Sequence, residues 1–216
     1  MGRLRKNTKY ENKLFNDSIY FVKNPALFKG EWNKNVFLNN NPIEIEIGSG
    51  KGRFIIENAL KFPDKNFIAI DKFPTILYKI ISKLKSLQLS NLKIICCDAK
   101  ELNNIFDYQE VSKIYLNFSD PWPKKNHEKN RLTNIDFLKR YFLILKKNQF
   151  IEFKTDNQSL YEYTLEVIKK YQLSLEYYSD NIYNDDQKNK ENIQTEYEIK
   201  WLAKNAQIKK IIIKNV

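Results

Sequence analysis

Residues 43–54 read Ile-Glu-Ile-Glu-Ile-Gly-Ser-Gly-Lys-Gly-Arg-Phe, in which alternating isoleucine and glutamate run into three glycines at every second position. The alternation is typical of a β-strand. Only five glycines occur in the 216 residues, so three in one turn indicate a backbone that a ligand approaches closely. Apolar residues at helical spacing follow, from Phe54 to Phe62. Strand, glycine turn and helix in this order predict a nucleotide-binding α/β fold, although the pattern is G-x-G-x-G rather than G-x-G-x-x-G.

Acidic residues stand at or near the ends of four predicted strands. One precedes the glycines and three follow apolar runs further along the chain: Glu46, Asp71, Asp98 and Asp120. A helix cap or a solvated loop is the ordinary explanation for any single one of them. In an open α/β sheet, however, these strand ends share the edge where ligands bind. Four acids at one edge therefore indicate a binding site.

An acidic sheet edge favours a cationic cofactor over a phosphorylated one. Carboxylates beside the glycine turn would repel a pyrophosphate, whereas S-adenosylmethionine has a positive sulfonium and amino group. Its ribose offers two hydroxyls to Asp71, and Gly48, Gly50 and Gly52 are expected to pack against its methionine and ribose parts. Residues 48–53 also lack the G-K-[ST] ending of a phosphate-binding P-loop.

The loop after the fourth strand combines a carboxylate, rigid backbone and cations. Residues 120–131 read Asp-Pro-Trp-Pro-Lys-Lys-Asn-His-Glu-Lys-Asn-Arg and contain the only histidine. The prolines prevent the backbone from continuing as a strand ladder or a helix. Cations beside an aromatic plane suit phosphates and a base, which indicates a site that handles a nucleotide. A solvated connection is the alternative for this segment taken alone.

Further motifs follow in order as far as Trp201. The segments are Asp-Pro-Trp-Pro-Lys-Lys at 120–125, His-Glu-Lys at 127–129, Arg-Leu-Thr at 131–133, Phe-Lys-Thr-Asp-Asn at 153–157 and Thr-Glu-Tyr-Glu at 195–198. In these segments the chain resembles the bacterial tRNA (guanine-N7)-methyltransferases. The resemblance implies a Rossmann-like class I methyltransferase of the α/β class, with a mostly parallel seven-stranded sheet, an antiparallel edge strand and helices on both faces.

The resemblance also implies roles for individual positions. The cofactor site of these enzymes is matched by Glu46, Asp71, Asp98 and Asp120, beside Gly48 and Gly50, and Asp120 is also the catalytic residue. The positions that contact the substrate are matched by Lys124, Asp156, Thr195, Glu196, Tyr197 and Glu198. The RNA-contacting loop is matched by Asn126, His127, Glu128, Lys129, Asn130 and Arg131. The family usually has glutamate at Asp71, and many relatives have arginine at Asn126 and Asn130.

The expected reaction needs alignment more than a base. Guanine N7 has a lone pair and no proton, so methyl transfer from a sulfonium is a direct displacement. Asp120 would stabilise the cationic product ring, and Asp156 would accept the N1 and N2 hydrogens of guanine. Trp122 or Tyr197 would receive a base drawn from its stack. The expected substrate is guanine 46 in the variable loop of tRNA, and the product is 7-methylguanosine.

Two other functions remain open on the sequence alone. The Asp-Pro-Trp loop is similar to the Asp-Pro-Pro-aromatic loops of enzymes that methylate exocyclic amines of RNA or DNA. A non-catalytic RNA-binding subunit could keep the same fold. Glu46, the glycine turn, Asp71 and Asp120 favour an active enzyme over that subunit.

Composition gives further expectations. Residues 1–30 are expected to form a basic N-terminal arm and leading segment, and residues 31–216 a single methyltransferase domain. The net charge of +11 agrees with a tRNA partner, although an excess of lysine, asparagine and isoleucine accounts for part of it. Without an apolar run long enough for a membrane span or a signal peptide, the protein is expected in the cytoplasm, as a monomer or homodimer. Cys96 and Cys97 are expected as free thiols, and one histidine gives no basis for a metal site.

The pattern beyond residue 120 predicts the remaining elements. A capping box of Thr133 and Asp136 is expected to begin a helix. The next predictions are a strand at 150–153, a helix around 160–168, a strand at 173–178, a polar loop at 181–194 and a strand at 195–201. The last two strands, with no helix between them, predict an antiparallel hairpin at the sheet edge.

Overall fold

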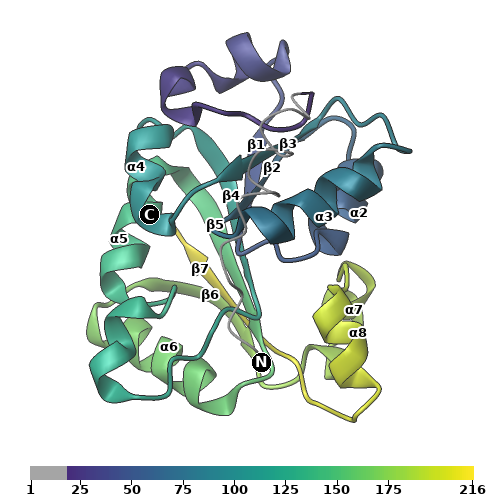
Figure 1. Cartoon of the computed structure of the whole chain (residues 1–216). Helices are drawn as coiled ribbons and strands as arrows, with labels where there is room; N and C mark the ends of the chain where they lie inside the picture. Colours follow the sequence, from purple (N-terminus) through teal and green to yellow (C-terminus); the bar gives the residue numbers. More distant parts are fainter. Residues whose placement is uncertain (1–18) are drawn as a thin grey trace.

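The computed structural model describes residues 19–216, so the first eighteen residues of the predicted basic arm lie outside the described residues. One seven-stranded sheet has the order β3-β2-β1-β4-β5-β7-β6 (Figure 1). Its strands are β1 (Ile43–Ile47), β2 (Asn66–Asp71), β3 (Leu92–Cys96), β4 (Val111–Asn117), β5 (Leu145–Thr155), β6 (Ser174–Ser179) and β7 (Lys209–Lys214). Strands β1 to β5 are parallel, and β7 is antiparallel to both β5 and β6. The predicted α/β sheet, with antiparallel pairing at one edge, is confirmed.

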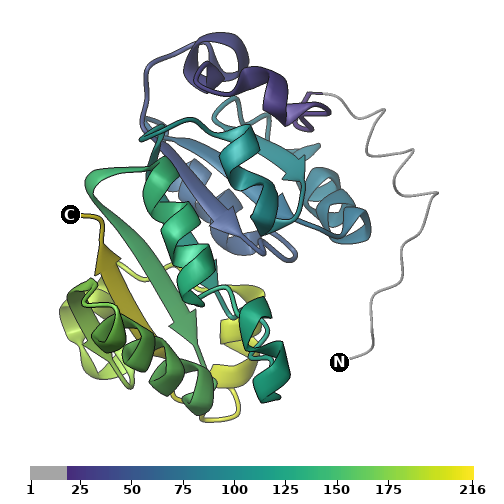
Figure 2. The same ribbon diagram turned by 90° about the vertical axis from the view of Figure 1, so that its left-hand side faces the viewer.

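Helices cover both faces of the sheet. In Figures 1 and 2, α4, α5 and α6 lie on one side, and α2 and α3 lie on the other together with the short α7 and α8. The α-helices are α2 (Arg53–Lys61), α3 (Pro74–Leu84), α4 (Leu102–Ile105), α5 (Ile135–Ile144), α6 (Gln158–Lys170), α7 (Asp186–Lys190) and α8 (Glu196–Leu202). Shorter 3-10 or π turns are η1 (Pro25–Phe28), η2 (Asn33–Phe37), η3 (Ala99–Glu101), η4 (Lys125–Asn130) and η5 (Ile182–Asn184).

The core has two apolar layers because strand side chains alternate between faces. Ile43, Ile45 and Ile47 of β1 belong to the layer that contacts α5 and α6, whereas Phe67 and Ala69 of β2 belong to the layer under α2 and α3. Burying one such isoleucine or phenylalanine side chain contributes about 1.5–3 kcal/mol. The two layers hold the carboxyl ends of the strands in fixed register.

The central strands carry charged side chains on the face toward α2 and α8. Glu44 of β1 is buried and forms a 2.8 Å ion pair with Lys65. Glu152 of β5 pairs with Lys113 of β4 and with Lys210 of β7. Burial opposes the ionised form of Glu152, but the two lysines outweigh burial and lower its pKa to about 2. The buried charges of Glu44 and Glu152 are therefore compensated by neighbouring lysines.

Residues 195–201 form most of a helix, so the strand predicted there is wrong. Thr195 Oγ1 accepts from the Glu198 N–H at 2.9 Å, and Glu198 Oε2 accepts from the Thr195 N–H at 3.3 Å, which together make a capping box. This local hydrogen bonding favours a helix over the alternating pattern. The strand that pairs with β6 is β7, and α7 and α8 lie between the two, so the predicted direct hairpin is also wrong.

Four smaller features differ from the predictions, and the first is that β5 begins at Leu145 and ends at Thr155 instead of spanning 150–153. Asn134 caps α5 by accepting from the Asp136 N–H at 3.0 Å, so the expected Thr133 capping box is wrong. The Thr133 hydroxyl is buried and hydrogen-bonded to Thr164 instead. Strand β4 ends at Asn117, which places Asp120 in the loop rather than at the strand end. The polar segment 181–194 contains η5 and α7.

The leading segment lies against the β3 edge. Tyr20, Phe21 and Val22 are buried, the Ile94 N–H donates to Tyr20 O at 2.8 Å, and the Val22 N–H donates to Ile94 O at 2.9 Å. The division at residue 30 stays a prediction. Within residues 19–216, no helix has the length and apolar character that a membrane crossing requires.

Candidate functional site

The glycine loop leaves open space at the carboxyl end of β1. Gly48, Gly50 and Gly52 all have positive φ, at 79°, 55° and 80°. A Cβ built on Gly48 or Gly50 would meet no atom within 4 Å, so a ligand can approach this backbone. At Gly52 a Cβ would lie 2.7 Å from Ile80, so this glycine allows α3 to pack closely. Gly48 and Gly50 therefore face the predicted cofactor space, whereas Gly52 does not.

Glu46 is a buried carboxyl group with one unused oxygen. It is 1% exposed, and its Oε1 accepts from Asn117 Nδ2 at 2.8 Å. Oε2 has no hydrogen-bond partner among the described residues. Burial raises the pKa of Glu46 to about 8, and the hydrogen bond from Asn117 and the charge of Lys154 offset only part of that effect. An unpaired buried carboxyl beside an open glycine loop is suited to a cationic group of a ligand.

Asp71 ends β2 and Asp98 follows the neighbouring strand β3, but the two carboxylates make different hydrogen bonds. Asp71 accepts from the Phe73 N–H at 3.0 Å and from the Gly50 N–H at 3.4 Å, which joins the end of β2 to the glycine loop. Burial raises its pKa. Asp98 is exposed and caps η3 by accepting from the Lys100 N–H at 2.9 Å. Asp71 therefore connects the end of β2 to the glycine loop, whereas Asp98 caps η3.

The loop that carries Asp120 has two residues in the left-handed region. Phe118 has φ of 52° and Trp122 has φ of 42°. Bulky residues rarely adopt this conformation, and such strain persists only where the surrounding structure enforces it. The Phe118 N–H donates to Lys154 O at 2.8 Å, and the Trp122 ring contacts the His127 ring edge-on at 5.5 Å. The exposed Asp120 lies between the two strained residues, in a loop held from both sides.

Arg131 donates hydrogen bonds to the backbone of the Asp120 loop. Its Nε donates to Pro121 O at 3.1 Å, and its Nη2 donates to Trp122 O at 3.1 Å. The guanidinium also stacks 4.2 Å from the centre of the Tyr163 ring. These contacts engage the Nε and Nη2 edge of the guanidinium within the protein. Sequence reasoning placed Arg131 in the RNA-contacting loop and missed this bracing contact.

Replacing Arg131 with lysine is expected to lower kcat about tenfold while tRNA affinity changes less than about twofold. Lysine keeps the charge but cannot donate to two carbonyls in a fixed plane. Steady-state kinetics and a binding titration on the same protein measure the two effects. A lysine variant with normal kcat and weakened tRNA binding would instead assign Arg131 to the RNA.

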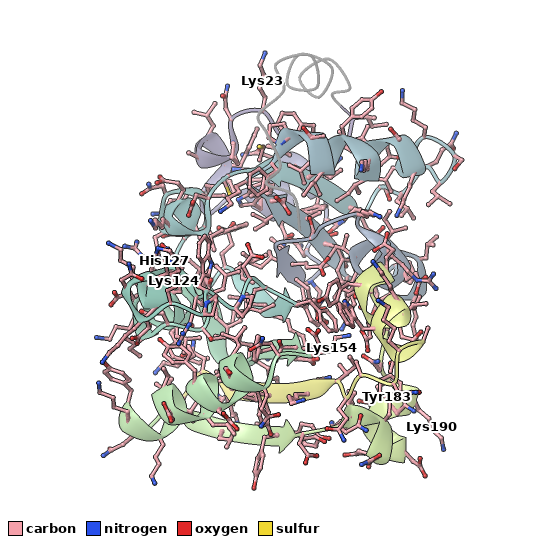
Figure 3. All side chains as sticks on the ribbon, turned by 60° about the horizontal axis from the view of Figure 1, so that its bottom comes forward. Lys23, Lys124, His127, Lys154, Tyr183 and Lys190 are labelled. Carbon is pink, nitrogen blue, oxygen red and sulfur yellow. The ribbon has the colours of Figure 1, made fainter. Side chains whose placement is uncertain are left out.

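The other residues of the predicted RNA loop are divided between the surface and the interior. Asn126 and Lys129 are exposed, while His127, Glu128 and Asn130 are partly buried. Lys124, which was predicted to contact the substrate, is exposed just before this loop. Figure 3 shows Lys124 and His127 together on one side of the molecule.

The first turn of α8 contacts two walls of the site. Glu196 pairs with Lys83 of α3 at 2.5 Å and accepts from the Arg53 N–H at 3.4 Å, beside the glycine loop. The Tyr197 hydroxyl donates to Asp156 Oδ2 at 3.2 Å, and its ring lies 5.0 Å from the Phe118 ring. The structure therefore brings the predicted substrate residues Tyr197 and Asp156 into contact, and it places Glu196 beside the glycine loop.

Glu198 and Thr195 differ from their predicted neighbours because both are buried. Glu198 is 0% exposed and pairs with Lys154 of β5 at 2.7 Å. Sequence reasoning missed Lys154 and Asn117 as residues of the site. Lys154 lies inside the quoted motif at 153–157, but its partner is 44 positions away.

No group of three or more histidine, cysteine, aspartate or glutamate side chains within residues 19–216 could hold a metal ion.

Comparisons with known proteins agree with this arrangement. A family model described as "Putative methyltransferase" matches residues 40–211. The tRNA (guanine-N(7)-)-methyltransferase of Malacoplasma penetrans (strain HF-2) is 52% identical over 217 residues, covering 100% of this chain and 98% of that protein. The protein of the same name from Bacillus subtilis (strain 168) is 43% identical over 201 residues, covering 93% of each.

Solved structures share the fold at low identity. The 16S rRNA methyltransferase KamB matches with a TM-score of 0.63 at 11% identity, over 86% of this chain and 92% of that chain. An antibiotic-related methyltransferase matches with a TM-score of 0.62 at 18% identity, over 85% of this chain and 92% of that chain. At these identities the likeness concerns the fold alone.

Proposed function

Since the chain belongs to the bacterial tRNA (guanine-N7)-methyltransferase family, we propose that it methylates N7 of guanine 46 in the variable loop of tRNA, giving 7-methylguanosine. It is an enzyme whose methyl donor is S-adenosylmethionine, and a tRNA substrate agrees with the expected cytoplasmic location. The observation that carries the proposal is the unpartnered Oε2 of Glu46 at the open glycine loop, on the same sheet edge as the Asp120 loop.

The residues at the carboxyl ends of β1 and β2 fit this cofactor. Bound S-adenosylmethionine supplies an electrophilic methyl group and carries a positive amino group. Glu46 Oε2 would accept from that amino group, and Gly48 and Gly50 leave the backbone accessible. Asp71 would accept from the ribose hydroxyls, because its hydrogen bond from the Gly50 N–H places its carboxylate beside the glycine loop.

The loop and α8 residues fit a purine with the hydrogen-bonding edge of guanine. Asp156, oriented by the Tyr197 hydroxyl, would accept the N1 and N2 hydrogens that adenine lacks. The Tyr197 and Phe118 rings would give the base an aromatic contact after it leaves its stack. Asp120 would then stabilise the positive charge that develops on the ring as N7 is methylated.

Lys124 would contact the tRNA backbone from the N-cap of η4. Replacing Lys124 with alanine is expected to weaken tRNA binding and to lower the salt dependence of log K by about 0.7–0.9 units of slope, the value for one lost phosphate contact. Binding titrations across a salt series measure the slope.

Lys146, near the amino end of β5, provides the matched control. Lys146→Ala should keep the wild-type slope because it lies at the opposite end of the strand from the site. An unchanged slope in Lys124→Ala would exclude a phosphate contact at that position.

The proposed function is tested with labelled S-adenosylmethionine and an unmodified tRNA transcript. Borohydride and aniline cleave RNA at 7-methylguanine, so label and cleavage at position 46 are the expected result. A transcript with adenine at that position should take up no label. Label without cleavage, or cleavage at another position, would contradict the proposal.

A further inference from the structure

A buried ion pair joins two of the sequence motifs. Lys154 of β5 is 3% exposed, and its ammonium group donates to Glu198 Oε2 at 2.7 Å. It also donates to Asn192 Oδ1 at 2.9 Å and to Ile193 O at 3.0 Å. All three hydrogens of the ammonium group are thus used inside the protein. Figure 3 shows Lys154 on the sheet beside the α8 segment, with Tyr183 close by.

The carboxylate of Glu198 is equally occupied. Oε2 accepts from Lys154 and from the Thr195 N–H, and Oε1 accepts from the Tyr183 hydroxyl at 2.9 Å and from Asn192 Nδ2 at 2.8 Å. A carboxylate offers about four acceptor positions. Since Glu198 is also 0% exposed, a substrate could contact it only after this network had been broken.

The two residues before Glu198 are the ones that reach the site. Glu196 contacts Lys83 and the Arg53 N–H beside the glycine loop. Tyr197 contacts Asp156 at the end of β5. The position of this helical turn therefore sets both contacts at once, and Glu198 is the residue that fixes the turn to the sheet.

Lys154 also acts on the cofactor side. It is the positive side chain whose charge offsets part of the burial of Glu46, whereas Glu196 and Asp71 add negative charge. Burial lowers the pKa of Lys154 itself, and Glu198 opposes that effect. Glu198 of α8 thus helps to keep Lys154, the cation near Glu46, in its charged form.

We propose that Lys154 and Glu198 are a positioning pair that fixes the first turn of α8 between the glycine loop and Asp156, and that Glu198 does not contact the tRNA. This inference rests on the proposed function, because it assigns part of that site. It changes the expectation for the Thr-Glu-Tyr-Glu segment, in which Glu196 and Tyr197 face the site and Glu198 holds them there.

The test is a double-mutant cycle of Lys154→Met, Glu198→Gln and both together. Removing one member of a buried ion pair leaves an uncompensated charge, whereas removing both does not. Thermal unfolding, affinity for S-adenosylhomocysteine and affinity for tRNA are measured for each protein. Glu191→Gln is the control, because Glu191 forms an exposed, 3.8 Å pair with Lys188 on the neighbouring α7.

Each single variant is expected to bind S-adenosylhomocysteine at least about tenfold more weakly, and the double variant no more weakly than the worse single variant. The double variant should also unfold at a higher temperature than either single variant. Because backbone phosphates supply much of the affinity for tRNA, the tRNA affinity of the folded variants should fall less than their affinity for S-adenosylhomocysteine, and Glu191→Gln should match wild type throughout.

Three results would overturn the inference. The first is loss of cofactor-product affinity that is additive across the cycle. The second is a double variant less stable than both single variants, which remains measurable if the single variants fold poorly. The third is about tenfold weaker tRNA binding in Glu198→Gln with unchanged affinity for S-adenosylhomocysteine. Failure of the proposed function would appear differently, as wild-type protein that does not methylate tRNA while the cycle behaves as expected.

Discussion

Asp120→Ala is expected to lower turnover on tRNA by at least about a hundredfold, the cost of removing one preorganised electrostatic group. The guanine ring becomes cationic as N7 is methylated, and Asp120 is the carboxylate of the loop held by Arg131 and by the Phe118 backbone. Because Asp120 is exposed, the free energy of unfolding should change by less than about 0.5 kcal/mol. Single-turnover rates at saturating cofactor and tRNA measure the effect.

Two further variants test whether the negative charge of Asp120 and its position in this loop cause the loss of activity. Asp120→Asn keeps the size of the side chain and should lose nearly as much activity as the alanine variant. Asp64→Ala removes an exposed carboxylate from the loop before β2, at the other end of the sheet, and should retain full activity. Near-normal turnover in Asp120→Ala would remove this residue from the mechanism.

Glu46→Gln is expected to weaken cofactor binding about ten- to hundredfold. A hydrogen bond to a charged group contributes about 1.5–3 kcal/mol, and glutamine cannot offer a negative oxygen to the amino group of S-adenosylmethionine. The unpaired Oε2 is the atom at which the contact is lost. Calorimetric titration of the purified protein measures the affinity.

The raised pKa of Glu46 gives this binding a pH dependence. Because burial raises the pKa to about 8, free enzyme at neutral pH holds this carboxyl mostly protonated. A cationic ligand prefers the ionised form, so binding below pH 8 releases a proton. Affinity should therefore rise about tenfold per pH unit between pH 6 and 7. Without ligand, the stability from this group is present below its unfolded pKa and is lost as the pH rises through 8.

Glu44→Gln is the matched control on the same strand. Glu44 is also buried, but its oxygens are already bonded to Lys65 and to the Tyr115 hydroxyl. This variant should lose stability and keep the cofactor affinity and its pH slope. If Glu46→Gln retained the wild-type slope, another group would have to be the one that titrates.

The sequence predicted the features of this fold that depend on neighbouring residues. The isoleucine and glutamate alternation at 43–47 produced β1, and the glycines that follow produced the left-handed turn before α2. The prediction was wrong at 195–201, where side chains at every second position indicated a strand. The capping box of Thr195 and Glu198, a local signal that the alternating pattern concealed, and the distant contact of Tyr197 with Asp156 favoured a helix.

Contacts between distant residues could not be inferred from one sequence. The pairing of Lys154 with Glu198 and the bracing of Pro121 by Arg131 depend on how separate elements pack. Lys154 and Arg131 both lie inside the motifs at 153–157 and 131–133. Their partners, and therefore their roles, became visible only in three dimensions.

The most direct test of N7 methylation compares two tRNA transcripts that differ only at ring position 7 of the base at position 46. One carries guanine and the other carries 7-deazaguanine, which keeps the N1, N2 and O6 groups but has a carbon in place of N7. With labelled S-adenosylmethionine, the account predicts full methylation of the guanine transcript and no label at position 46 of the deaza transcript. Label on the deaza transcript would place the methyl group on another atom, such as the exocyclic amine, and would contradict N7 methylation.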